Sequence, residues 1–490
     1  MKLQPWGVRM TRICATLGPA SSSSAALTAL VRAGMDLARL NFSHGRPEEH
    51  ARVVRRLRAV ARKAGRPIGV MQDLQGPRIR LGEIKDGAVV LQPRSSVRIV
   101  CGPAGRRLVG DEHALSLSYA GLPRDVRRGE RLLLKDGSVL LRVDSVRGDV
   151  LQTTVERGGR VTTHAGLNAP DSRLRVPALT ARDLAHLDAG VAMGVDAVAL
   201  SFVRDARDVH RAREYLRARG SDALVIAKIE RAEALLNLDE ILVAADGVIV
   251  ARGDLGVECP VETVPLLQKD IIRRSMERGT FVITATQMLE SMTSSETPTR
   301  AEVSDVANAI LDGTDAVMLS GETAVGKHPA AAVATMDRIA RAVEGHVHLD
   351  GLRVPRASLS PSDFVSAVAR SGVELAELAG ARALIPFTAT GRTAALLSAV
   401  RPSIPMFALT YHDAVCRRLN FYRGVFAQRI PMSSTLDRLF VKGVEHLRKG
   451  GFVHRGDVVV LIGGSKLAHA SANTMKVQRI GVNDQPDASS

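Results

Sequence analysis

Residues 197–230 read AVALSFVRDARDVHRAREYLRARGSDALVIAKIE, and this stretch decides the fold. Two short apolar runs, at 197–202 and 224–229, flank an amphipathic segment at 206–218. An apolar run of this length bounded by polar residues is typical of a strand, whereas apolar residues at helical spacing predict a helix. The stretch therefore predicts a strand–helix–strand unit, and such units build parallel sheets.

The same alternation recurs on both sides of this stretch. Strands are expected at 12–17, 36–41, 68–73, 197–202, 224–229, 247–251, 281–286 and 316–319. Amphipathic helices are expected after most of them, at 25–33, 48–64, 181–193, 206–218, 264–278, 300–311 and 330–343. Eight such units predict a closed (β/α)8 TIM barrel, whose catalytic groups lie at the C-terminal ends of the strands.

The alternation is interrupted after the third strand. Between Gly76 and about Arg175 the pattern changes to short alternating strands, and Lys135-Asp136-Gly137 separates two of them, at 132–134 and 139–143, as a hairpin turn would. This pattern predicts an inserted all-β domain at the active-site end of the barrel, where it would serve as a lid. A passive insertion is the alternative.

A third region begins at about Asp350. It alternates expected helices at 365–378, 394–400 and 436–448 with expected strands at 383–387, 406–410 and 458–462, a pattern typical of a doubly wound α/β domain. The 490 residues are thus expected to form three domains: a barrel at 1–76 and 176–348, a lid at 77–175, and a C-terminal α/β domain at 349–490.

Composition restricts the possible functions. The net charge is +16, but the basic residues are scattered over predicted helices, which favours a solvated basic surface. Nucleic-acid binding is disfavoured because aromatic residues are only 3% of the chain and no RNA-binding motif is present. The four cysteines form no CxxC pair, and no signal core or membrane-length apolar run is found, so a cytoplasmic protein without a membrane association is expected.

Charged residues end the predicted barrel strands. Lys228-Ile229-Glu230 ends the fifth strand and Arg252-Gly253-Asp254 ends the sixth. Because side chains alternate along a strand, Lys228 is expected to share a face with Glu230, and Arg252 with Asp254. Two carboxylates on adjacent strands beside a lysine suit Mg²⁺ or Mn²⁺ and a phosphoryl group. A structural ion-pair network at the barrel mouth is the alternative. Polar strand ends also occur at 39–44, 73, 284–287 and 320–322.

The stretches at 15–21, 39–45, 227–230, 251–258, 285–292 and 298–322 together resemble the pyruvate kinases, and the resemblance extends over residues 11–480. It implies phosphoryl transfer from phosphoenolpyruvate to ADP, giving pyruvate and ATP in the last step of glycolysis, with Mg²⁺ or Mn²⁺ as cofactor and a homotetramer as the assembly. A catalytically silent, nucleotide-sensing relative is the alternative. The intact Lys228, Glu230, Asp254 and Thr286 argue against it.

The resemblance also implies individual roles. Lys228 would neutralise the transferring phosphoryl group, and Arg39 would contact the phosphate. Glu230 and Asp254 would hold the metal. Gly253, Asp254 and Thr286 would clamp the substrate carboxylate, with Thr286 helping to protonate the enolate carbon through water. The nucleotide-facing set would be Asn41, Phe42, Ser43, His44 and Arg80.

Three departures from the family pattern affect the nucleotide and potassium sites. Leu74 and Arg78 stand where K⁺-dependent members carry Thr and Glu, Ala165 replaces a lysine, and Lys135 replaces an acid. By resemblance the K⁺ ligands would be Asn41, Ser43, Asp73 and the carbonyl of Leu74. Our hypothesis is that the fixed positive charge of Arg78 takes the place of the ion, so that K⁺ is not required. The alternative is that Arg78 points to solvent at the hinge of the lid.

The C-terminal domain carries a possible regulatory site between a predicted strand and a predicted helix. A helix N-terminus binds anions, and hydroxyls and an arginine strengthen such a site. The resemblance implies that a phosphorylated effector binds there, with AMP or a sugar monophosphate as first candidates. Ordinary helix capping is the alternative. The residues concerned are Thr388, Thr390, Gly391, Arg392 and Thr393.

Overall fold

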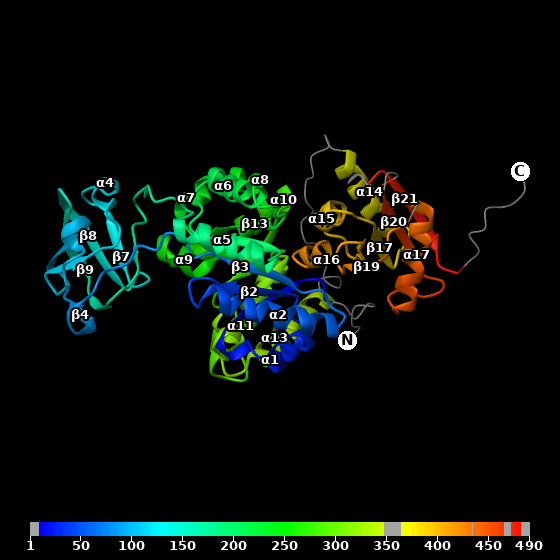
Figure 1. The fold of residues 1–490 in the computed structure, drawn as a ribbon, viewed down its shortest axis with the longest axis horizontal. Helices are drawn as coiled ribbons and strands as arrows, with labels where there is room; N and C mark the ends of the chain where they lie inside the picture. The colour runs from blue at the N-terminus through cyan, green and yellow to red at the C-terminus, as the bar shows by residue number, and fades with distance from the viewer. Residues whose placement is uncertain (1–8, 347–363, 434, 465–471, 482–490) are drawn as a thin grey trace, which may run out of the picture.

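The computed structural model describes residues 9–346, 364–433, 435–464 and 472–481, which form three bodies along one axis. Figure 1 shows the barrel in the middle, with the inserted domain at one end and the C-terminal domain at the other. The expected boundary at 348/349 lies outside the described residues. Within those ranges no helix is long and apolar enough to cross a membrane, and all four cysteines are free thiols.

Eight parallel strands close the barrel in the order β1-β16-β15-β14-β13-β12-β3-β2. Every expected barrel strand is present, with ends that differ from expectation by at most two residues. The bounds are β1 (Arg12–Leu17), β2 (Leu37–Asn41), β3 (Gly69–Asp73), β12 (Ala197–Leu200), β13 (Leu224–Ile229), β14 (Gly247–Ala251), β15 (Phe281–Ala285) and β16 (Ala316–Leu319). The (β/α)8 prediction is therefore confirmed.

The barrel helices begin and end at residues with a clear local reason. Thr180 and Thr299 accept hydrogen bonds from the backbone N–H groups of the first turns of α5 and α11, and Gly34 and Gly194 end α1 and α5 in a left-handed conformation. The helices are α1 (Ser24–Ala33), α2 (Pro47–Lys63), α5 (Ala181–Met193), α6 (Ala206–Arg217), α7 (Ala232–Leu236), α8 (Leu238–Ala244), α9 (Arg252–Glu258), α10 (Val264–Arg278), α11 (Arg300–Leu311), α12 (Gly321–Ala324) and α13 (Pro329–His346).

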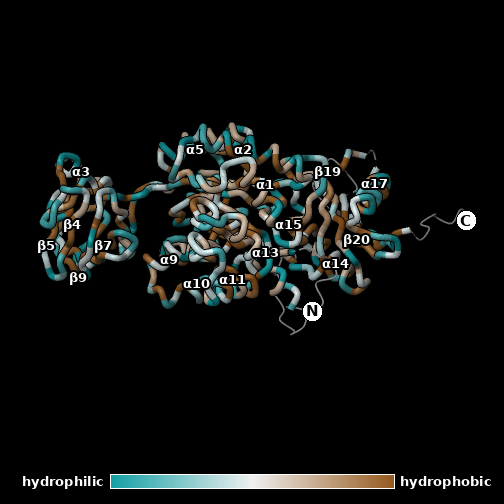
Figure 2. Tube along the Cα trace, turned by 90° about the horizontal axis from the view of Figure 1, so that it is seen from below, coloured by the Kyte–Doolittle hydropathy of each residue, from teal (hydrophilic) through white to brown (hydrophobic). Residues whose placement is uncertain are grey.

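The inserted domain is built almost entirely of strands around its own apolar core. A six-stranded sheet, β11-β7-β8-β9-β5-β6, is joined by the pair β10-β4. Two short helices, α3 (Gly102–Gly105) and α4 (Leu122–Asp125), are the additions to the all-β expectation. The expected hairpin is β7 (Arg131–Leu134) with β8 (Val139–Arg147), and the other strands are β4 (Ala88–Leu91), β5 (Ser96–Val100), β6 (Ala114–Ser116), β9 (Val150–Arg157), β10 (Gly159–Thr162) and β11 (Leu167–Asn168). Figure 2 shows the narrow connection to the barrel.

The C-terminal domain has helices on both faces of its sheet, which confirms the doubly wound prediction. One apolar cluster joins Leu384 to α14 (Phe364–Leu378), α15 (Arg392–Ala399) and α16 (Asp413–Leu419), whereas the opposite cluster joins Ile385 to α17 (Leu436–Lys449). The strands are β17 (Ala383–Pro386), β18 (Leu409–Thr410), β19 (Gln428–Arg429), β20 (Val458–Gly463) and β21 (Thr474–Arg479). β21 is antiparallel and was not predicted.

The C-terminal domain covers the N-terminal end of the barrel. Phe421 is fully buried and packs with Leu37, Ile249 and Phe281 among the inward-facing barrel residues. Arg401 makes a buried two-pronged ion pair with Asp315, at 2.7 and 2.8 Å. The base of the barrel is thereby sealed, and the opposite end faces the inserted domain.

Candidate active site

Lys228 and Glu230 share a face at the C-terminal end of β13, as the strand alternation predicts. The Lys228 Nζ atom lies 2.6 Å from Glu230 Oε1 and 3.3 Å from Asp73 Oδ1. It also donates a 2.7 Å hydrogen bond to Ser201 Oγ. Burial opposes the ammonium charge, but the carboxylates of Asp73 and Glu230 outweigh it and raise the pKa of Lys228. The lysine is therefore protonated throughout the physiological range.

Asp73, at the end of β3, joins this lysine to Arg39 on β2. Arg39 Nε donates to Asp73 Oδ2 at 2.7 Å, and its Nη1 donates to Thr16 Oγ1 at 3.0 Å. Burial would raise the pKa of Asp73, but Lys228 and Arg39 together lower it below its ordinary value. One buried carboxylate thus holds two cations at the barrel mouth.

The carboxyl group of Glu230 loses its proton less readily than an ordinary carboxyl group. Burial, together with the charge of Asp254, raises the pKa of Glu230 to about 7 despite the opposing effect of Lys228. Its second oxygen accepts a 2.8 Å hydrogen bond from the Phe202 N–H, and Phe202 is held at a φ of 58°. Buried carboxylate oxygens next to a second carboxylate are the donor set that Mg²⁺ or Mn²⁺ prefers, so the residues fit such an ion.

Arg252 and Asp254 do not share a face, and that expectation was wrong. The strand β14 ends at Ala251, and Arg252 begins the helix α9, in which residues two apart point in different directions. Arg252 turns away to Asp305, at 2.7 Å, and to the Ala285 carbonyl. Asp254 instead lines the cavity that contains Glu230.

Thr286 lies directly after β15 in a strained backbone conformation. Its φ is 70°, and Gln287 beside it has a φ of 54°, a conformation that is unfavourable for β-branched residues. The Thr286 hydroxyl accepts a 2.9 Å hydrogen bond from the Gly253 N–H and donates one of 2.6 Å to the Ala285 carbonyl. The hydroxyl is therefore fixed next to the first turn of α9, and such strain is typical of functional sites.

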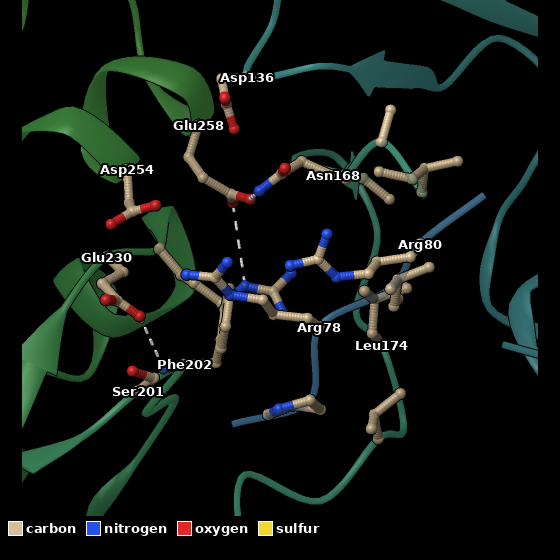
Figure 3. A pocket seen from close by; sticks show the side chains of 18 of the residues that line it. Arg78, Arg80, Asp136, Asn168, Leu174, Ser201, Phe202, Glu230, Asp254 and Glu258 are labelled. Atoms are coloured by element: carbon tan, nitrogen blue, oxygen red, sulfur yellow. Dashed lines mark hydrogen bonds and ion pairs between the residues drawn. The ribbon is translucent and has the colours of Figure 1, made fainter. Parts of the chain in front are cut away.

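A cavity of about 410 Å³ separates the barrel mouth from the inserted domain. Lys228, Glu230 and Asp254 line its barrel side. Figure 3 shows Arg78 and Arg80, from the chain that enters the inserted domain, reaching into the same space. The two walls are linked by a 3.1 Å hydrogen bond from Asn168 Nδ2 to the carboxylate of Glu258, the last residue of α9.

The residues expected to face the nucleotide are divided between two cavities. Arg80 lines the cavity under the inserted domain, whereas Asn41 and His44 line a second one of about 650 Å³ beside Thr16 and α2. Ser43 N–H donates to Asn41 Oδ1 at 3.1 Å. The Phe42 side chain is only 1% exposed and stacks on His50 at 4.4 Å, so it packs in the core.

The residues expected to bind an effector lie together where the loop after β17 meets α15, with Arg392 and Thr393 in the first turn of that helix. The Gly391 N–H donates to Thr388 Oγ1 at 2.9 Å, and the Arg392 N–H donates to Thr390 Oγ1 at 3.4 Å. Gly391 has a φ of 95°, which favours glycine. Thr393 is buried, whereas Arg392 is exposed. Both Thr388 and Thr390 hydroxyls thus order the loop, and they retain lone pairs and a hydroxyl proton for a ligand.

Several residues of the site were not identified from the sequence. Ser201 accepts from Lys228 and directly follows β12, so its place at the C-terminal end of a barrel strand was a usable signal. Thr16, which accepts a hydrogen bond from Arg39, is the last residue but one of β1 and lies at the same end of the barrel. Asn168 and Glu258 carried no such signal because their contact joins two domains.

Comparison with known proteins identifies this architecture. The family model "Pyruvate kinase, barrel domain" matches residues 8–333, and "Pyruvate kinase, alpha/beta domain" matches residues 366–478. A crystal structure of a pyruvate kinase from Cryptosporidium parvum superposes with a TM-score of 0.90 at 34% identity, covering 98% of each chain.

Curated relatives are similar along nearly the whole chain. A pyruvate kinase from Geobacillus stearothermophilus is 42% identical over 479 residues, which cover 96% of this chain and 80% of the relative. One from Mycobacterium intracellulare is 41% identical over 477 residues, or 97% of this chain and 99% of the relative. Two pyruvate kinase family models match 8–333 and 366–478, and relatives that are 41% and 42% identical are similar along nearly the whole chain, so this chain belongs to the pyruvate kinase family.

Proposed function

We propose that this phosphotransferase moves the phosphoryl group of phosphoenolpyruvate to ADP at the barrel mouth, with a divalent cation held by Glu230 and Asp254. The observation that carries the proposal is the buried network of Lys228, Glu230, Asp73 and Arg39 below a cavity of about 410 Å³. Phosphoryl transfer requires mainly positioning and neutralisation of charge, and this network supplies fixed charges of both signs.

Glu230 and Asp254 would hold Mg²⁺ or Mn²⁺. Bound there, the ion would neutralise phosphoryl oxygens and orient them against the acceptor. The protein orients both carboxylates for the ion. The Phe202 N–H donates a 2.8 Å hydrogen bond to Glu230, and Asp254 lies in the first turn of α9 on the wall of the same cavity.

Lys228 would stabilise the phosphoryl group as it leaves phosphoenolpyruvate. Its ammonium group is fixed by Glu230, Asp73 and Ser201, so little reorganisation is needed when charge develops on the transferring oxygens. Arg39 would contact the same phosphate, because Asp73 holds it beside Lys228.

Thr286 and Gly253 would hold the carboxylate end of the substrate. The N–H groups in the first turn of α9, including that of Asp254, have no partner within the helix and would meet the carboxylate. The Gly253 N–H, which is paired with Thr286 Oγ1 at 2.9 Å, would hold that hydroxyl beside them. The Thr286 hydroxyl, which donates to the Ala285 carbonyl at 2.6 Å, would turn its proton to a water molecule and so help to protonate the enolate carbon.

ADP would span the two cavities. Arg80, whose Nη1 donates to the His164 carbonyl at 2.9 Å, would meet the phosphates under the lid. Asn41 and His44 would meet the nucleoside in the second cavity. The Thr16 hydroxyl supports this arrangement because it both lines the second cavity and bonds Arg39. Ser43 would act by orienting Asn41, and Phe42 by packing beneath it.

K⁺ would not be required. Three of the four groups that would bind it are already engaged by the protein: Asp73 by Arg39 and Lys228, Asn41 Oδ1 by the Ser43 N–H, and the Leu74 carbonyl by Ser201 Oγ at 2.8 Å. Arg78 lines the cavity with its fixed charge, and nothing in the described part of the chain forms an ion pair with it in the structure. Both features support the hypothesis that the guanidinium of Arg78 takes the place of a bound K⁺ ion.

Regulation, assembly and location complete the proposal. A phosphorylated effector, AMP or a sugar monophosphate, would bind the loop that contains Arg392. The exposed side chains of Met475 and Val477 on the edge strand β21 support assembly into a homotetramer, since apolar side chains on an unpaired strand edge favour association. Four free cysteines support the reducing cytoplasm as its location.

Formation of pyruvate by the purified chain tests the proposal. Pyruvate is expected only when phosphoenolpyruvate, ADP and Mg²⁺ or Mn²⁺ are all present, and chelation should abolish it. The folded variant Glu230→Gln should require far more metal for half-maximal rate. A rate that is unaffected by chelation would refute the metal assignment.

A further inference from the structure

The lid wall of the active-site cavity carries a lysine that the fold does not need. Lys135 lies at the end of β7 and lines the cavity, and its side chain is exposed. Its Nζ atom makes one long contact in the structure, 3.4 Å to the Arg160 carbonyl oxygen. No carboxylate in the described part of the chain pairs with it.

The backbone holds Lys135 in a position from which its ammonium group can reach the cavity. The Lys135 N–H donates to the Gly166 carbonyl at 3.0 Å, so Lys135 stands beside the strand that follows Ala165. Lys135 and Asp136 have φ values of 50° and 52°, and Gly137 has 81°. Lysine is uncommon in this left-handed region, and the turn therefore fixes an otherwise unfavourable position.

Two residues next to Lys135 on the lid wall offer no free positive charge. His164 Nε2 lies 3.2 Å from Glu83 Oε1, and Ala165 presents only a methyl group. Arg80 is tied to the His164 carbonyl. Asp136 also lines the cavity, so the turn offers one cation and one anion to whatever binds there.

The opposite wall determines which ligand group meets this lysine. Glu230 and Asp254 suit a metal ion, so an anionic ligand shared between that ion and the lid would present phosphate oxygens to Lys135. We propose that Lys135 binds the phosphate chain of the nucleotide from the lid, beside Arg80, and positions it over the barrel network. This inference rests on the proposed function, because that function supplies the nucleotide.

The test compares nucleotide binding with turnover in matched variants. Lys135→Gln should raise the Kd for Mg²⁺–ADP, measured by calorimetry, and the KM for ADP about tenfold, the usual effect of losing one charge-assisted hydrogen bond. The KM for phosphoenolpyruvate should change less than twofold. Arg147→Gln removes the same charge from the far end of β8, where Arg147 is exposed, and should leave both constants unchanged.

A second variant restores the charge from the neighbouring strand. Ala165 also lines the cavity, so Ala165→Lys in the Lys135→Gln background should recover most of the ADP affinity. An unchanged Kd in Lys135→Gln, an equal rise in Arg147→Gln, or no recovery in the folded double variant would overturn the inference. If the wild type bound ADP through Lys135 but formed no pyruvate, the proposed function would fail and this inference would stand. Absence of ADP binding in the wild type would overturn both.

Discussion

Replacing Lys228 with methionine removes the cation on which the proposed chemistry depends. The ammonium lies 2.6 Å from Glu230 and 3.3 Å from Asp73, and only 12% of its side chain is exposed. Losing one partner of a buried ion pair costs ~3–5 kcal/mol of stability. Here Asp73 keeps Arg39, and Glu230 can take up a proton because its pKa is already raised to about 7. We therefore expect a loss of about 3 kcal/mol at alkaline pH and a smaller loss below pH 7.

The effect on turnover should be larger than the effect on folding. Removing one fixed charge from the site of a developing anion costs about 10²–10³-fold in kcat, and at about 1.4 kcal/mol per factor of ten this corresponds to about 3–4 kcal/mol. Steady-state pyruvate formation measures kcat, and urea unfolding shows that the variant is folded. Lys269→Met is the matched control, because Lys269 is half exposed and, within the described residues, pairs only with Asp312. A folded Lys228→Met enzyme within tenfold of the wild-type kcat would refute the assigned role.

Four further perturbations test separate parts of the structure. Arg78→Glu should lower activity in a K⁺-free tetramethylammonium buffer and make added K⁺ stimulatory. The wild-type enzyme should be equally active in the tetramethylammonium buffer and in a K⁺ buffer of the same ionic strength. A wild-type enzyme that depends on K⁺ would contradict the hypothesis that Arg78 replaces the ion. The raised pKa of Glu230 means that the folded apo protein keeps a proton that the unfolded chain has lost, so this carboxyl lowers stability as pH rises from about 4.5 to about 7. Over the same range Mg²⁺ affinity, measured by calorimetry, should increase, and Glu230→Gln should remove most of that pH dependence. Arg392→Ala should weaken activation by AMP or a sugar monophosphate at low phosphoenolpyruvate. Arg448→Ala, which changes an exposed arginine of the same domain, should leave that activation unchanged, and equal activation of the two variants would place the effector elsewhere. Phe421→Ala should cost about 3–5 kcal/mol in urea unfolding, because it empties a fully buried aromatic position under the barrel, and a loss below about 1 kcal/mol would show that the C-terminal domain does not seal it.

The barrel could be predicted from the sequence because each strand is a short apolar run with polar residues at its end. The bounds of β1, β13, β14 and β16 agree with the sequence patterns to the residue. The strand alternation also placed Lys228 and Glu230 on one face, since β13 continues as extended chain up to the carboxylate. Local periodicity was sufficient in these cases.

Features that depend on distant contacts or on a change of local conformation were not predictable in the same way. The side chains of Arg252 and Asp254 point in different directions because α9 begins directly after β14. No loop residues separate the two elements, so the sequence carries no signal of where the strand ends. The burial of Phe42 depends on His50 and His186, which come from two different helices. The hydrogen bond between Asn168 and Glu258 depends on how the lid sits on the barrel, which local sequence does not specify.

Phosphorus NMR of the reacting mixture tests the central claim most directly. With phosphoenolpyruvate, ADP and Mg²⁺ present, the phosphoenolpyruvate signal should disappear as the γ-phosphate signal of ATP grows in equal amount, and Lys228→Met should slow both together. Growth of an inorganic phosphate signal in place of ATP, or no change in either signal with the folded wild-type protein, would contradict direct transfer at the Lys228–Glu230 site.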